Sequence, residues 1–213
     1  MAAAKKAHDG FEGATGRVAG AVMAHLNRDM ENAAIDELDP RDGDAVLAVG
    51  FGPGVGLAEL VNRVPAGLIA GVDPSPTMVA QATRRNRAAV VAGRVDIARA
   101  GAEAIPWRDD RFDGVLAVNS IQLWKPLEAG LTEVARVLRP GGVFVALTHD
   151  WAIEKARPLH EWLAATTALL EERGLSGITM RKGQFRSGSG TMLRSVLLRS
   201  CNQTAPERRG RAV

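Results

Sequence analysis

The sequence predicts an α/β fold with a doubly wound seven-stranded sheet, an antiparallel C-terminal hairpin and an N-terminal helical appendage. Three observations lead to this prediction. From Asp44 onward, short runs rich in Val, Ile and Leu alternate with longer amphipathic segments, which is typical of a parallel sheet with crossover helices. The first of these runs leads into a loop with glycine at every second position, and 213 residues suit one medium-sized globular unit.

The expected elements follow in chain order. Segment 17–38 has apolar residues at roughly helical spacing, so one or two helices should precede the sheet. Strands are predicted over 45–49, 67–72, 89–95, 114–118 and 142–148, and helices over 57–63, 76–87 and 127–138. A further helix is predicted over 158–173, ended by Gly174. Strands over 178–185 and 192–198, joined by the glycine- and serine-rich residues 187–190, should form the hairpin.

These elements suggest three parts: a helical cover over 1–41, the α/β domain over 42–200, and a flexible basic tail over 201–213. The net charge of +3 comes from the C-terminal end. Residues 1–180 hold 19 basic and 23 acidic side chains, whereas residues 181–213 hold 8 and 1. The charge therefore does not predict a nucleic-acid partner, and the basic hairpin is either a solvated face or an attraction for an acidic acceptor.

Composition excludes several kinds of site. Cys201 is the only cysteine, which excludes an intrachain disulfide, a cysteine-built zinc site and an iron–sulfur cluster. No clustered His, Asp and Glu pattern predicts a metal ion. Because tyrosine is absent, histidines and carboxylates are the candidate proton acceptors. We expect a cytoplasmic monomer or homodimer without a membrane partner, since no run of about 18 apolar residues and no secretory signal pattern occur.

The strongest local signal is the segment 46–56, which reads VLAVGFGPGVG. Glycine permits positive φ and lets a ligand approach the main chain where a Cβ would collide. At the carboxyl end of the first strand, open α/β sheets bind nucleotides. No frame fits the dinucleotide pattern G-x-G-x-x-G, since the glycines stand at 50, 52, 54 and 56. A tight structural turn is the other interpretation.

This spacing resembles the first motif of class I S-adenosylmethionine-dependent methyltransferases, which have a Rossmann-like fold. Three later segments resemble further landmarks of that family: GVDPSP at 71–76, AEAIPW to RFDGV at 102–115, and LRPGG at 138–142. Together they span roughly 42–200 in the right order. The resemblance, which points to the small-molecule, UbiE-like branch, implies S-adenosylmethionine as cofactor and S-adenosylhomocysteine as product.

The resemblance also implies site residues. Asp73 would accept hydrogen bonds from both ribose hydroxyls, although it could instead cap the following helix. The other expected cofactor contacts are Gly50, Phe51, Gly52, Gly54, Pro74, Met78, Ala102, Glu103, Asn119, Ser120 and Asn27.

Two positions depart from the family pattern. The family has an acidic residue where this chain has Ala48, and an aspartate at the adenine amino group where it has Gly101. Hydrogen bonds are worth about 0.5–3 kcal/mol each, so both losses together would weaken cofactor binding roughly tenfold to several-hundredfold without compensation. Glu103 is the candidate replacement at the adenine, unless it is simply an exposed loop residue. Asn27 is the candidate at the methionine end.

For the acceptor, methyl transfer mainly requires positioning. An alcohol or amine acceptor would gain from a general base, whereas a carboxylate or phenolate needs only orientation. His149 is the first candidate for a base because imidazole titrates near neutrality, and His25 is the second. Gln122, Trp124 and Trp151 are expected to line the acceptor site, with core packing as the other interpretation of the tryptophans.

We therefore expect a methyltransferase that acts on a small organic molecule or peptide of the natural-product type, by O-methylation with proximity catalysis. Asn119 is followed by Ser-Ile-Gln rather than by the [D/N]PP[Y/F/W] motif of nucleic-acid amino-methyltransferases. Transfer to nitrogen or carbon remains open. So does a protein that binds S-adenosylmethionine or S-adenosylhomocysteine without transferring a methyl group.

Overall fold

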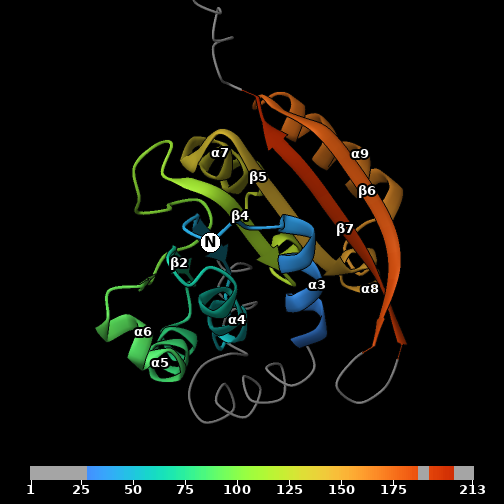
Figure 1. Cartoon of the computed structure of the whole chain (residues 1–213). Coiled ribbons are helices and arrows are strands. Elements are labelled where there is room, and N and C mark those ends of the chain that lie inside the picture. Colours follow the sequence, from blue (N-terminus) through green and yellow to red (C-terminus); the bar gives the residue numbers. More distant parts are fainter. Residues whose placement is uncertain (1–27, 187–191, 204–213) are drawn as a thin grey trace, which may run out of the picture.

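The computed structural model of the chain describes residues 28–186 and 192–203 (Figure 1). Within them, one sheet has the strand order β3-β2-β1-β4-β5-β7-β6. The strands are β1 Ala45–Val49, β2 Leu68–Val72, β3 Val95–Ala98, β4 Phe112–Val118, β5 Leu138–His149, β6 Leu175–Arg186 and β7 Met192–Asn202. The first five pair in parallel, and β7 lies antiparallel between β5 and β6. The doubly wound sheet with an antiparallel C-terminal hairpin is confirmed.

Helices cover both faces of this sheet. They are α3 Arg28–Leu38, α4 Val55–Arg63, α5 Pro76–Arg85, α6 Arg87–Val91, α7 Leu127–Val137, α8 Asp150–Glu154 and α9 Leu159–Glu171, with a 3₁₀ turn η2 at Ile121–Leu123. Buried residues of α3, α4 and α5 share one core with the sheet, and those of α7, α8 and α9 share the other. In this part of the chain, no helix is both long and apolar enough to cross a membrane.

The central strand β1 shows why the sequence reads as a continuous apolar run. Val46 and Ala48 belong to the core under α3 and α4, whereas Leu47 and Val49 belong to the core under α7 and α9. Every residue of β1 is buried. Strands covered on both faces lose the apolar–polar alternation of half-exposed strands.

The sequence pattern predicts a strand over 89–95, and the structure shows that this is wrong. The chain forms α6 there, and β3 begins only at Val95. Val91 is 80% exposed, so the apolar run is a surface helix rather than a buried strand. Gly93, with a φ of +70°, then turns the chain into β3. A short run of Ala and Val does not distinguish these two states by periodicity alone.

Several boundaries also shift. β5 begins at Leu138, so the LRPGG segment forms the start of this strand rather than a turn before it. β6 begins at Leu175, directly after Gly174 with its φ of +75°. β7 runs to Asn202, two residues into the predicted tail, because Cys201 and Asn202 pair with Ser176 and Leu175 of β6. Residues 17–27 of the predicted N-terminal helix and the hairpin turn at 187–190 lie outside the described residues.

Candidate functional site

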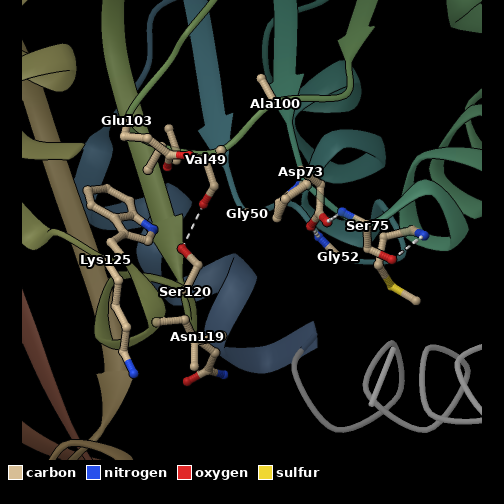
Figure 2. A pocket seen from close by; sticks show the side chains of 16 residues that line it. Val49, Gly50, Gly52, Asp73, Ser75, Ala100, Glu103, Asn119, Ser120 and Lys125 are labelled. Atoms are coloured by element: carbon tan, nitrogen blue, oxygen red, sulfur yellow. Dashed lines mark hydrogen bonds between the residues drawn. The ribbon is translucent and has the colours of Figure 1, made fainter. Parts of the chain in front are cut away.

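A cleft of about 170 Å³ opens where β1, β2 and β4 end (Figure 2). This edge of the sheet lies where the strand order reverses between β1 and β4, the position at which doubly wound sheets bind ligands. Of the predicted site residues, the cleft is lined by Gly50, Gly52, Asp73, Pro74, Met78, Ala102, Glu103, Asn119, Ser120 and Trp124. It is also lined by six that the sequence did not single out as site residues: Val49, Ser75, Ala100, Gly101, Leu123 and Lys125.

The other predicted residues fall elsewhere. Phe51, Gly54, Gln122, His149 and Trp151 are not among the residues that line this cleft. His25 and Asn27 lie outside the described residues. Phe51 faces the core, because a Cβ on Gly71 would come within 2.6 Å of its ring. Gly54 ends the loop with a φ of 79° at the start of α4, against Ala82. Both residues thus hold the conformation of the glycine-rich loop and do not line the cleft.

The glycine-rich loop is held against β4. A Cβ on Gly50 would lie 2.4 Å from the Cβ of Ser120, so only glycine fits at this approach. The Ser120 hydroxyl donates to Val49 O at 2.7 Å, and the Gly50 N–H donates to Val72 O at 2.8 Å. The ends of three neighbouring strands are thereby fastened together beneath the cleft. This cradle leaves room for a ligand to lie against the main chain.

Asp73 stands at the end of β2 with 6% of its surface exposed. Its Oδ2 accepts the Gly52 N–H at 2.9 Å, and its Oδ1 accepts the Ser75 N–H at 2.9 Å. Each carboxylate oxygen has a second lone pair. The helix cap is Ser75, whose hydroxyl accepts the Met78 N–H at 3.4 Å, so the alternative interpretation of Asp73 as the cap is wrong.

Glu103 folds back over Gly101. A Cβ on Gly101 would lie 2.3 and 2.4 Å from the two carboxylate oxygens of Glu103. The carboxylate therefore occupies the space in which a side chain at position 101 would begin. Both residues line the cleft, and Figure 2 shows Glu103 in its upper part. The side chain of Glu103 is thus placed where the sequence lacks an acidic group at 101.

Trp124 lies both in the core and in the lining of the cleft. It is 9% exposed and belongs to the core, where its ring lies 6.4 Å from that of Phe144. It also lines the cleft, next to Leu123 and Lys125. Lys125 is exposed, and no carboxylate in the described part of the chain forms an ion pair with it. Figure 2 shows its side chain extending along the side of the cleft where Asn119 lies.

Asn119 joins the cleft to its surroundings. Its backbone has a φ of 49°, its Nδ2 donates to Met30 Sδ at 3.4 Å, and its Oδ1 accepts the His149 N–H at 3.3 Å. The Gln122 amide bridges Asn119 O at 2.9 Å and the Thr148 hydroxyl at 2.8 Å. Gln122 therefore braces the ends of β4 and β5 rather than lining the cleft.

His149 lies beside this network. Its Nδ1 is 3.0 Å from Ser195 Oγ, and its ring stacks on Trp151 at 5.8 Å. Trp151 is 45% exposed and carries the Lys155 ammonium 4.4 Å from its ring centre. Asp150 accepts the Trp151 N–H at 2.7 Å. His149 is therefore next to Asn119 along the sheet edge, with its imidazole directed to β7.

Two carboxylates outside the cleft lining, Glu31 and Glu133, have shifted pKa values. Burial, and next the charge of Glu59, raise the pKa of Glu31 to about 8. The side-chain hydrogen bond from Arg136 holds the pKa of Glu133 below its ordinary value. Glu133 in turn accepts the Ile105 N–H at 2.9 Å, while Arg136 donates to Ile105 O at 2.9 Å and Trp107 O at 2.8 Å. This pair holds the segment that follows Glu103.

Comparisons with known proteins agree with this geometry. A family described as a methyltransferase domain matches residues 46–142. The uncharacterised methyltransferase YdaC of Bacillus subtilis is 31% identical over 125 residues, which cover 59% of this chain and 67% of YdaC. The chain belongs to the class I S-adenosylmethionine-dependent methyltransferases. Its relatives include the UbiE C-methyltransferase of ubiquinone and menaquinone biosynthesis in Paracoccus denitrificans.

Two further comparisons bear on this methyltransferase. A fatty-acid O-methyltransferase of Mycolicibacterium smegmatis is 36% identical over 104 residues, which cover 49% of this chain and 36% of that enzyme. The crystal structure of YcgJ from Bacillus subtilis shares the fold, with a TM-score of 0.65, 18% identity, and coverage of 82% of this chain and 98% of YcgJ. The match spans two thirds of YdaC but 54% or less of the UbiE protein and the fatty-acid enzyme.

Proposed function

We propose that this methyltransferase transfers the methyl group of S-adenosylmethionine to an oxygen of a small organic acceptor, and that the acceptor is a carboxylic acid. The observation that carries the proposal is the distribution of charge along the cleft. Among the described lining residues, the acidic side chains are Asp73 and Glu103, and the basic one is Lys125. The cation lies on the side of Asn119, away from Glu103 (Figure 2).

The lining suits each part of the cofactor. The Asp73 carboxylate suits two ribose hydroxyls, because each of its oxygens can accept more than one hydrogen bond and the backbone donors of Gly52 and Ser75 fix its orientation. The carboxylate of Glu103 suits the amino group of adenine. Met78 and Ala102, which both line the cleft, offer apolar surface for the adenine ring. The open main chain at Gly50 and Gly52 suits the methionine part.

The acceptor end calls for little catalytic machinery. The bound cofactor supplies a methyl group activated by a sulfonium. An acceptor carboxylate is already anionic, so its oxygen can form the new C–O bond while the electron pair of the C–S bond leaves with sulfur, and no proton needs to be removed. The task of the protein is to orient the acceptor and exclude water.

Lys125 and its neighbours fit an acid with an apolar body. A lysine ammonium attracts a carboxylate over the short range at which exposed charges act. Leu123, which is 41% exposed, and Trp124 provide apolar surface beside it. The fatty-acid O-methyltransferase among the relatives acts on acceptors of this class by its name. A hydroxyl acceptor would instead require a base, for which His149 is the candidate.

A transfer assay tests the proposal. Purified protein is incubated with methyl-tritiated S-adenosylmethionine and a series of straight-chain carboxylic acids, with primary alcohols and amines of matched chain length as controls. We expect label in the acids alone, and we expect it to be released as methanol on alkaline hydrolysis of the ester. Label in the amines or alcohols but not the acids would overturn the acceptor class. Cofactor binding without transfer to any acceptor would favour a binding protein.

A further inference from the structure

One carboxylate on α3, which is not among the residues that line the cleft, remains without a function in the description above. Glu31 lies on α3, and its Oε2 would be 2.3 Å from a Cβ built on Gly56. The carboxylate therefore rests directly on the main chain of α4. Gly56 is the second residue of this helix, and Gly54 of the glycine-rich loop is its N-cap. The helices α3 and α4 lie side by side (Figure 1).

Among the residues that the structure describes, no ion pair offsets the charge of Glu31. The nearest charged influence is Glu59, which is also acidic, and burial opposes ionisation further. Arg28, on the same helix as Glu31, is directed to Glu59 at 3.8 Å. The N-cap of α4 is Gly54, which has no side chain to cap the helix. A partly buried carboxylate without a donor or cation is costly to the folded protein.

The position of Glu31 connects it to the cofactor end of the sheet. Its neighbour Met30 accepts the hydrogen bond from Asn119, which lines the cleft. Gly56 follows directly on the loop whose Gly50 and Gly52 line the cleft. The start of α3 therefore meets both the β4 end and the glycine-rich loop. Ala48, on the sheet face that α3 covers, provides no acidic group there.

The chemistry of the cofactor indicates what this carboxylate binds. S-adenosylmethionine carries an α-ammonium group at the end opposite to adenine. The acidic residues that line the cleft, Asp73 and Glu103, suit the ribose and the adenine. The loop itself offers backbone N–H groups, which suit the cofactor's carboxylate rather than its ammonium. We infer that Glu31 is the residue that binds the α-ammonium group of the cofactor.

This inference refines the cofactor site and rests on the cofactor placement proposed above, but not on the acceptor. A cation brought to Glu31 would offset both its burial and the charge of Glu59. The charge of Glu31 would then destabilise the ligand-free protein and stabilise the complex with the cofactor. Such a conflict between the stability of the free protein and ligand binding distinguishes a binding residue from a structural one.

The test compares two ligands in isothermal titration calorimetry. S-adenosylhomocysteine carries the amino acid part, whereas methylthioadenosine has the same nucleoside without it. In Glu31→Gln, which keeps the shape of the side chain, we expect the affinity for S-adenosylhomocysteine to fall at least about tenfold, the usual effect of losing a charged hydrogen bond. Methylthioadenosine should bind as tightly as it does to the wild type.

Glu59→Gln is the matched control, because it removes the neighbouring carboxylate without touching the proposed contact. Its affinity for S-adenosylhomocysteine should stay within about twofold of the wild type. An unchanged affinity in Glu31→Gln, or an equal loss for both ligands, would overturn the role of Glu31. If the wild type binds neither ligand, the cofactor placement itself is wrong and the inference fails with it.

Discussion

The carboxylate of Asp73 accepts the backbone N–H of Gly52 at 2.9 Å, and this contact joins the end of β2 to the glycine-rich loop after β1. One residue therefore both shapes the loop and lines the cleft. The relationship makes the loop geometry depend on Asp73, so that binding and stability should respond together to its loss.

Asp73→Ala should weaken the binding of S-adenosylhomocysteine by about 30-fold or more, because two hydrogen bonds to a charged acceptor are lost. It should also lower the free energy of unfolding by about 1–3 kcal/mol, since the N–H groups of Gly52 and Ser75 lose their acceptor. Calorimetry and urea unfolding measure the two effects. Asp96→Ala, which removes a carboxylate bonded to the Trp107 side chain at 3.0 Å, is the control for binding. Full affinity in Asp73→Ala would contradict the ribose role.

The contact between Glu103 and Gly101 predicts selectivity for adenine. Glu103→Gln should bind S-adenosylhomocysteine about three- to tenfold more weakly than the wild type, because the charged acceptor for the adenine amino group is lost. The analogue with hypoxanthine in place of adenine should bind both proteins alike. Gly101→Ala should imitate this loss, since the new Cβ displaces the Glu103 carboxylate that lies 2.3 Å from it. Equal discrimination between the two bases in all three proteins would exclude Glu103 from the adenine contact.

The raised pKa of Glu31 predicts a pH dependence of stability. The folded protein binds this proton up to a pKa of about 8, whereas the unfolded chain releases it near the ordinary pKa of 4.5. Between these values the folded state holds more protons, so the stability of the ligand-free protein should fall as pH rises from about 5 to 8. Below this window the penalty is absent, and above it the penalty is complete.

Glu31→Gln should remove that dependence and raise the melting temperature of the ligand-free protein at pH about 8.5 more than at pH about 5. Glu59, which opposes ionisation of Glu31, and Arg28, which lies 3.8 Å from Glu59, are the charged neighbours that set the size of the effect. Differential scanning calorimetry at both pH values checks it. A variant less stable than the wild type at the higher pH would show that Glu31 is a structural residue.

The proposed acceptor chemistry separates Lys125 from His149. Lys125→Gln should raise the KM for a carboxylic acid by about fivefold or more with little change in kcat, because an attraction to the ground state is lost. His149→Ala should leave kcat for the acid within about threefold, since an anionic acceptor needs no base. Lys155→Gln, whose ammonium lies on Trp151 away from the cleft lining, is the control. A loss of about a hundredfold in His149→Ala would instead assign His149 as a base.

The Arg136 cluster predicts a link between stability and the adenine end. Arg136 pairs with Glu133 at 2.7 Å and donates to the carbonyl oxygens of Ile105 and Trp107. Arg136→Met should reduce the free energy of unfolding by about 2–4 kcal/mol, because Glu133 loses its charged partner and two carbonyl groups lose a donor. Since the pKa of Glu133 is lowered, this stabilisation should itself decline as pH falls below about 4.5. Urea unfolding at neutral and acid pH measures both.

The local pattern predicted some elements better than others. The sequence predicted β1 and β2 correctly because short apolar runs bounded by glycines are typical of buried strands. The helices that follow them have clear amphipathic spacing. The strand expected over 89–95 failed because Ala and Val form either a strand or a surface helix, and the exposed Val91 belongs to α6. The site prediction reached ten residues of the cleft through motifs that each lie on one short segment.

By itself the sequence determined the alternation of strands and helices, the glycine-rich loop and the carboxylate that follows β2, because each depends on neighbours within a few residues. Only the tertiary structure decided which acidic groups stand beside the loop. Glu31 meets Gly56 through the packing of α3 on α4. From the sequence alone, a glutamate at this position of a helix is expected to be exposed to solvent. Contacts between segments far apart in the chain are set by how whole helices pack on the sheet, which no short stretch of sequence records.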